Sequence, residues 1–141
     1  MPDLDYSTLP QSLRPLLDKF YRAHGSSMRA SGEGQLWVAR DGGIIAGLSL
    51  TAVMEGFWLT GLFVEPRWRG RGVAGELIAN ALATVAGPTW LFCHPDLRGF
   101  YEKLGFSHAT RLPQALADRL ARYSHGKSLI ALGISSAAKN E

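Results

Sequence analysis

Cysteine is almost absent from this chain of 141 residues, since Cys93 is the only one. No disulfide can therefore form within the chain, which fits a reducing compartment. No apolar run approaches the roughly 18 residues needed to span a bilayer, and the N-terminus lacks the basic-then-apolar order of a signal peptide. The four histidines and the cysteine show no metal-ligand spacing. We therefore expect a cytoplasmic protein without a membrane span or a metal site.

The charge balance is only mildly basic, with a formal net charge of +3. Such an excess suits an anionic ligand such as a nucleotide, and equally a slightly basic surface without a function. Nucleic acid is a less favoured partner because the basic residues form no stripe interleaved with aromatic side chains. No Ser-His-Asp arrangement can be argued from spacing.

Apolar residues recur at helical spacing in some segments and in continuous or alternating runs in others, which predicts a mixed α/β fold. We expect one domain over residues 1–134 and a frayed tail at 135–141. The crossover from 57 to 93 should join two parallel strands. Helices are expected at 11–24, about 74–85, 96–104 with Asp96 as its cap, and from Pro113. Strands are expected at 36–39, 44–53, 57–64, 89–93 and 129–134, the first three as an antiparallel meander.

The strongest motif is VEPRWRGRGVAGELI, residues 64–78, which follows a predicted strand and opens a predicted helix. Gly70 and Gly72 lack a Cβ, so the backbone can turn tightly and a ligand can approach it. The first amides of the helix and its dipole favour an anion, and Arg69 and Arg71 add positive charge. The motif predicts a pyrophosphate site, although a surface turn with solvated arginines would show the same tetrapeptide.

Two segments resemble the GNAT acetyltransferase superfamily. Arg69-x-x-Gly72-x-Ala74 matches its Arg/Gln-x-x-Gly-x-Gly/Ala signature, and HPDLRGFYEKLGF, residues 94–106, is similar to its second motif. The resemblance implies an α/β fold of the GNAT (acyl-CoA N-acyltransferase) type, a central mixed sheet flanked by helices. The N-terminal strand of that fold is short or missing here, with residues 4–6 as a remnant.

The resemblance also implies that acetyl-CoA is the cosubstrate and that its parts bind to particular residues. The pantetheine arm would pair with the backbone of Leu62, Phe63 and Val64, in the way that a peptide adds a strand to a sheet. His94 and Tyr101 would also contact the cofactor. The pyrophosphate would lie on the amides of Arg69, Gly70, Arg71, Gly72, Val73 and Ala74.

Tyr101 is the main catalytic candidate because its O–H could donate to the thiolate that leaves when an amine attacks the thioester. The base is open between Glu55 in a predicted hairpin, Glu65 after a predicted strand, His94, and water. Each side chain has a plainer interpretation, the two glutamates as solvated residues and His94 as a positioning group. The family's usual asparagine is replaced by His94 and its usual alanine by Leu97.

The leading functional prediction is direct transfer of an acetyl group from acetyl-CoA to a primary amine of a small molecule or protein. A non-catalytic CoA-binding regulatory module is one alternative, and a ribosome- or RNA-associated protein is another. A homodimer could form through an exposed strand edge at residues 129–134. The sequence does not identify the amine that accepts the acetyl group.

Overall fold

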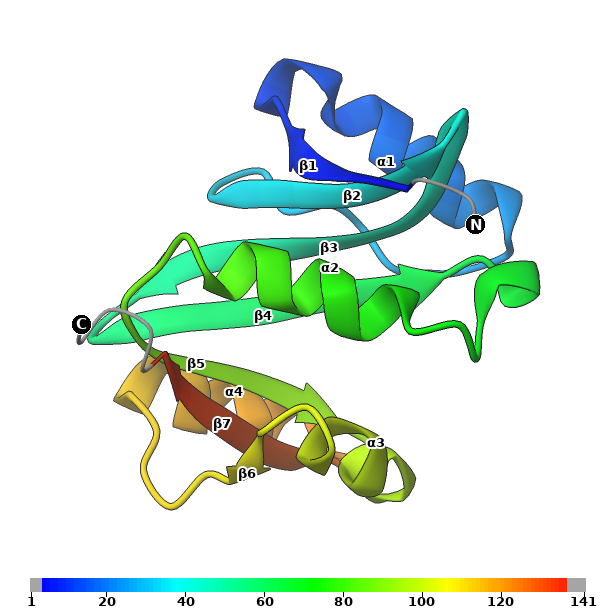
Figure 1. Cartoon of the computed structure of the whole chain (residues 1–141). Helices are drawn as coiled ribbons and strands as arrows, with labels where there is room; N and C mark the ends of the chain where they lie inside the picture. The colour runs from blue at the N-terminus through cyan, green and yellow to red at the C-terminus, as the bar shows by residue number, and fades with distance from the viewer. Residues whose placement is uncertain (1–3, 137–141) are drawn as a thin grey trace. The chain divides into compact units, whose positions relative to one another are not determined.

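The computed structural model describes residues 4–136 and shows a seven-stranded mixed sheet flanked by helices (Figure 1). This confirms the predicted fold class. From one edge of the sheet to the other, the strands lie in the order β1-β2-β3-β4-β5-β7-β6. Their bounds are β1 Asp5–Leu9, β2 Gln35–Asp41, β3 Gly43–Val53, β4 Gly56–Val64, β5 Gly87–Cys93, β6 Ser107–His108 and β7 Ile130–Ser136.

The predicted helices and strands follow one another in the predicted order, and the structure adds β1 before α1 and β6 between α3 and α4. The α-helices are α1 Arg14–Ala23, α2 Val73–Leu82, α3 Arg98–Glu102 and α4 Gln114–Tyr123, and short 3-10 helices occupy Gln11–Leu13, Pro66–Trp68 and Pro95–Leu97. Strands β1 and β2 and strands β2 and β3 pair antiparallel, and β4 pairs with β5 in parallel. The antiparallel β2–β3 pair and the parallel crossover therefore agree with the prediction.

Backbone contacts group the chain into two compact units. The N-terminal unit comprises Met1–Thr51 and Leu59–Thr84, and the C-terminal unit comprises Ala52–Trp58 and Val85–Glu141. Each unit contains its own buried side chains, for example Leu17 in the N-terminal unit and Leu91 in the C-terminal unit.

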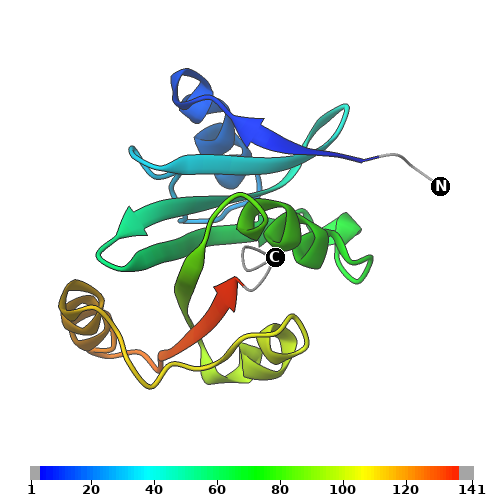
Figure 2. The same ribbon diagram turned by 60° about the vertical axis from the view of Figure 1, so that its left-hand side comes forward.

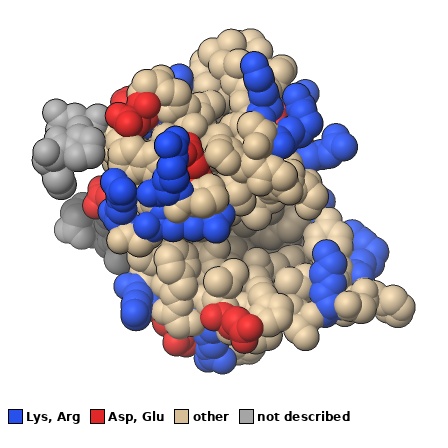
Figure 3. Space-filling view, turned by 90° about the vertical axis from the view of Figure 1, so that its right-hand side faces the viewer, with Lys and Arg blue, Asp and Glu red and all other residues tan. Residues whose placement is uncertain are grey.

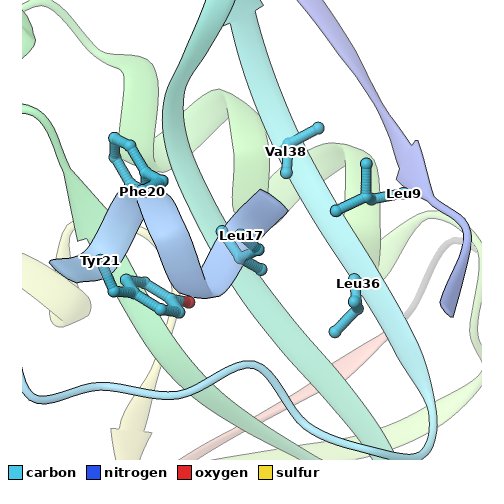
Figure 4. Close-up of a cluster of buried hydrophobic side chains, with 6 residues drawn as sticks. All are labelled: Leu9, Leu17, Phe20, Tyr21, Leu36 and Val38. Atoms are coloured by element: carbon cyan, nitrogen blue, oxygen red, sulfur yellow. The ribbon is translucent and has the colours of Figure 1, made fainter. Parts of the chain in front are cut away.

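In the N-terminal unit, α1 and α2 cover opposite faces of the strands (Figure 1). Alternate residues of β2 point to opposite faces, and those on one face pack with α1 in a cluster made of Leu9, Leu17, Phe20, Tyr21, Leu36 and Val38 (Figure 4). The helix can approach closely because β3 carries Gly47, where a Cβ would lie 2.5 Å from Leu17 Cδ1. Helix α2 packs on β1 and β2.

In the C-terminal unit, β7 pairs along its whole length with β5, and α3 and α4 lie on different faces of this pair (Figure 2). On the α4 face, the ring of Phe92 contacts Trp58 and Tyr123, at centroid distances of 5.6 and 6.4 Å. The neighbouring residue Cys93 points the other way, toward Tyr101 of α3. Both faces of the β5 strand are therefore covered, as its wholly apolar sequence predicts.

Several boundaries differ from the prediction. The N-terminal strand exists as β1, which is longer than the expected remnant and is followed at once by Pro10. Helix α2 ends at Leu82, before the predicted Val85. Strand β7 continues to Ser136, and residues 137–141 of the predicted tail lie outside the described residues.

The expected free edge at residues 129–134 is wrong for Leu132 and Gly133. The two-residue strand β6, which no periodic pattern predicts, pairs antiparallel with Leu132 and Gly133 of β7. Strand β7 therefore lies between β5 and β6, and Leu132 and Gly133 are not open to a second chain, whereas Ile134 is paired only with β5.

Candidate cofactor and catalytic sites

The predicted pyrophosphate loop is a turn between the 3-10 helix Pro66–Trp68 and α2. Gly70 and Gly72 have φ values of 77° and 79°, a left-handed conformation that side chains with a Cβ adopt at a cost. A Cβ built on either glycine would meet no atom within 4 Å. The loop thus needs glycine for its backbone conformation and leaves open space above the backbone.

The N-terminus of α2 is not capped by a side chain. Its N-cap is Gly72, and the first bond of the helix runs from the amide of Glu76 to the carbonyl of Gly72, at 3.1 Å. The amides of Val73, Ala74 and Gly75 in the first turn therefore have no acceptor within the helix, whereas the amide of Arg69 donates to the carbonyl of Pro66 at 3.2 Å. With the positive end of the helix dipole beside them, these amides form a suitable site for an anion.

Two arginines of the loop are held by neighbouring aromatic rings. The Nε of Arg69 donates to the carbonyl of Val64 at 2.9 Å, and its guanidinium lies 5.0 Å from the centroid of Phe63. The guanidinium of Arg71 lies 5.1 Å from the centroid of Trp68. Neither arginine forms an ion pair with another described residue. Their remaining N–H groups are therefore free to bind a phosphate.

The predicted pantetheine segment is the end of β4, and it contains a feature that the sequence analysis missed. Gly61, just before Leu62, has a φ of 69°, so the strand is irregular at this point. Its carbonyl accepts a hydrogen bond from the hydroxyl of Tyr21 at 2.6 Å. A glycine inside an apolar strand could have signalled this irregularity. Helix α1 is thereby attached to the strand immediately before residues 62–64.

Glu65 is buried, which contradicts its interpretation as a solvated residue. Only 9% of it is exposed, and its carboxylate accepts a hydrogen bond from Arg67 Nε at 2.9 Å. The other carboxylate oxygen lies 4.0 Å from Nε2 of His24 at the end of α1. The carboxylate is thus engaged by two basic side chains, because a charge that leaves water needs partners.

Tyr101 lies on α3 with 8% of its surface exposed, and its ring packs edge-on against Phe100 and Phe106. Burial, with a smaller contribution from the Cys93 thiol, raises the pKa of Tyr101 to about 12. The hydroxyl has no hydrogen-bond partner among the described residues. It is therefore protonated at neutral pH and available to donate to a ligand.

His94 ends β5 and acts as the N-cap of the 3-10 helix Pro95–Leu97. Its Nδ1 accepts the amide of Asp96 at 3.1 Å, so the cap is His94 and not Asp96 as predicted. In the neutral imidazole the proton then resides on Nε2. The same nitrogen lies 3.5 Å from Oδ2 of Asp96. These contacts with the helix that follows favour the interpretation of His94 as a positioning group.

Glu55 is not brought together with Tyr101. It occupies the β3–β4 turn with a φ of 71°, and its carbonyl lies near Gly87, at the start of β5. Tyr101 packs near Cys93, at the other end of this seven-residue strand. A strand of this length spans roughly 20 Å. The separation arises because β4 runs parallel to β5, so the turn before β4 lies at the beginning of β5.

Among residues 4–136, no group of three or more His, Cys, Asp or Glu side chains is arranged to hold a metal ion. None of the described helices is long and apolar enough to cross a membrane.

Comparison with known proteins identifies the family. The acetyltransferase (GNAT) domain family matches residues 32–108, whereas no curated protein sequence matches the chain. The ribosomal-protein-S18-alanine N-acetyltransferase from Escherichia coli has a similar structure, with a TM-score of 0.69, 16% identity, and coverage of 95% of this chain and 94% of that one. N-acetylglutamate synthase from Neisseria gonorrhoeae, complexed with coenzyme A and L-arginine, has a TM-score of 0.73 at 13% identity, over 97% of this chain and 34% of that one.

Another similar structure is that of Rv2747 from Mycobacterium tuberculosis in complex with CoA and NLQ. Its TM-score is 0.67 at 12% identity, with coverage of 93% of this chain and 98% of that one. These likenesses establish the fold, and the domain match covers more than half of the chain, including the glycine loop and Tyr101. The chain belongs to the GNAT acetyltransferase family.

Proposed function

We propose that this protein transfers the acetyl group of acetyl-CoA directly to a primary amine of a small molecule or a protein. The observation that carries this proposal is the loop at residues 69–74. It combines two left-handed glycines, the uncapped amides of α2 and two arginines without a carboxylate partner among the described residues. Each of these features stabilises the charge of a pyrophosphate. The backbone of Leu62, Phe63 and Val64 is the proposed partner of the pantetheine amides.

Tyr101 is the proposed donor to the sulfur that leaves. When the amine nitrogen attacks the carbonyl carbon, the C–S bond breaks and negative charge develops on sulfur. A phenol with a pKa of about 12 is a weaker acid than an ordinary thiol with a pKa near 8.5. Full proton transfer to the thiolate would therefore be unfavourable. Tyr101 should instead stabilise the thiolate with a hydrogen bond, and solvent then protonates it.

Water is the proposed acceptor of the proton that the attacking ammonium must lose. The Nδ1 of His94 is engaged by the Asp96 amide, Glu55 lies at the far end of β5, and the Glu65 carboxylate is paired with Arg67. Of the candidates for the base, water is thus the one that is neither held by another group, as His94 and Glu65 are, nor distant from Tyr101, as Glu55 is. The cytoplasmic location stays a prediction.

Transfer of radiolabel from acetyl-CoA to a panel of polyamines, amino acids, aminoglycosides and peptide N-termini tests the reaction. The expected result is labelled product with at least one amine class. Calorimetric titration with CoA should be carried out on the same samples. Binding of CoA without transfer to any class would favour the non-catalytic regulatory module, and absence of binding would refute both.

Tyr101→Phe separates the catalytic role from cofactor binding. Loss of one charge-stabilising donor should lower kcat by about 10²-fold or more, with CoA affinity changed by less than about threefold. Phe100→Leu is the matched control, because this neighbour is 43% exposed and has no hydroxyl. Equal losses of turnover and affinity in Tyr101→Phe would contradict the donor role.

A further inference from the structure

The C-terminal unit contains an open pocket of about 470 Å³ that none of the predicted cofactor or catalytic residues lines. It is formed by the start of β5, by β6 with residues 109–111 that follow it, and by the end of β7. Its volume lies within the range of small-molecule sites. We propose that it binds a small organic carboxylate with an apolar or aromatic body.

Two glycines, Gly133 and Gly105, make room for the apolar side chains that line the pocket. Gly133 of β7 is paired with Trp90 of β5, and a Cβ on it would lie 3.0 Å from Cδ1 of the indole. A Cβ on Gly105, which has a φ of 103°, would lie 3.0 Å from Cδ1 of Ile134. Because Trp90 is paired with Gly133 and Ile134 is the next residue of β7, the indole and the isoleucine side chain lie on opposite faces of the β5–β7 pair. Glycine at position 133 lets the indole extend along the pocket floor, where it would pack on the body of a ligand.

One wall is a strand edge that lacks a partner. Strand β6 ends its pairing with β7 at Gly133, so Ile134 and Ser135 are paired with β5 on one side and with no described strand on the other. Backbone groups at such an edge can bind a polar ligand. The short length of β6 thus opens the pocket beside β7.

The polar groups of the lining favour an anion. They include the side chains of Arg111, His108 and Thr110, and none of the lining residues within 4–136 is Asp or Glu. Arg111 has no hydrogen-bond or ion-pair partner in the part of the chain that the structure describes, and neither has the indole N–H of Trp90. These donors of a basic and an aromatic side chain, together with the apolar floor, match a carboxylate attached to an apolar body.

The indole N–H resonances report binding directly. The chain has four tryptophans, and Trp90→Phe assigns the signal of Trp90 in a spectrum of ¹⁵N-tryptophan-labelled protein. The probes are benzoate and 3-phenylpropionate, with benzamide and 3-phenylpropionamide as neutral controls of the same shape. Sodium chloride at equal ionic strength controls for general salt effects. The Trp90 signal should shift saturably with a carboxylate and not with its amide.

Arg111→Gln should weaken carboxylate binding about tenfold or more, because it removes a charge-assisted hydrogen bond. Arg122→Gln removes the same charge from α4, outside the lining, and should leave the affinity unchanged. Absence of a saturable Trp90 shift with both carboxylates would overturn the proposal. So would equal binding of the amides, or equal affinity of the wild type and Arg111→Gln. Failure of acetyl transfer would leave this result unaffected, since the readout is binding at Trp90.

Discussion

The amide of Asp96 donates a hydrogen bond to Nδ1 of His94 at 3.1 Å, which makes a histidine the cap of the short helix before α3. This bond determines the tautomer of the imidazole and connects the end of β5 to the segment that carries Tyr101. It therefore leads to a prediction that separates positioning from base catalysis.

His94→Asn should retain the cap, because the asparagine oxygen can accept the same amide, whereas His94→Ala should lose about 1 kcal/mol of stability. Urea denaturation measures both. If His94 is a positioning group, the pH profile of kcat/KM should keep its shape in His94→Asn. Disappearance of one limb of that profile in the variant would instead assign the base to His94.

Alanine at Gly72 should weaken CoA binding beyond its effect on folding. The left-handed φ of 79° makes a Cβ unfavourable by about 1 kcal/mol, although no atom lies within 4 Å of it. Gly42→Ala is the control, since its φ is 80°, its surroundings are equally open, and it lies in the β2–β3 turn. Both variants should lose similar stability, and only Gly72→Ala should lose CoA affinity by calorimetry. Equal affinities would contradict the proposed pyrophosphate site.

Stability should fall as the pH rises above about 10. The pKa of Tyr101 is raised from 10.0 to about 12 on folding. Below pH 10 the phenol is protonated in both states. Between pH 10 and 12 the unfolded chain loses the proton first, which favours unfolding by up to about 2–3 kcal/mol. Burial also raises the pKa of Tyr21 and adds to this slope. Tyr101→Phe should therefore remove only part of the alkaline loss in thermal melts, and an unchanged slope would argue against the buried phenol.

Glu65→Ala should destabilise the protein by about 1–3 kcal/mol, because it removes a buried carboxylate that accepts a hydrogen bond from Arg67. Glu33→Ala is the comparison, since that glutamate is exposed in the loop after α1 and should change stability by less than about 0.5 kcal/mol. Urea denaturation distinguishes the two. Similar midpoints would mean that the Glu65 carboxylate is solvated in solution.

The distribution of charged side chains on the surface does not support the alternative that this protein binds RNA. On the face shown in Figure 3, Lys and Arg side chains lie in several separate groups, and Asp and Glu side chains accompany some of them. A continuous basic stripe is the usual electrostatic footprint of nucleic-acid binding.

The sequence by itself was sufficient for the features that depend on local patterns. Helical spacing predicts that one face of the first helix is buried, made of Leu13, Leu16, Leu17, Phe20, Tyr21 and His24. Leu17, Phe20 and Tyr21 are buried, whereas Leu13 and Leu16 are exposed. The continuous apolar run from 89 to 93 predicts a doubly covered strand. Glycines at 70 and 72 predict a tight turn before a helix, and both residues adopt the left-handed conformation that few other residues accept. The family could be inferred from the same loop and from the Tyr101 segment.

Only the tertiary structure determined which of these segments pair or pack with one another. Strand β6 has two residues, too few for a periodic pattern, and it exists because β7 provides its hydrogen-bond partners. Glu65 is buried because α1 places His24 beside it, and Glu55 is separated from Tyr101 because β4 and β5 run parallel. Strand pairing and side-chain burial depend on residues that are distant along the chain. The spacing of residues within one segment therefore cannot predict them.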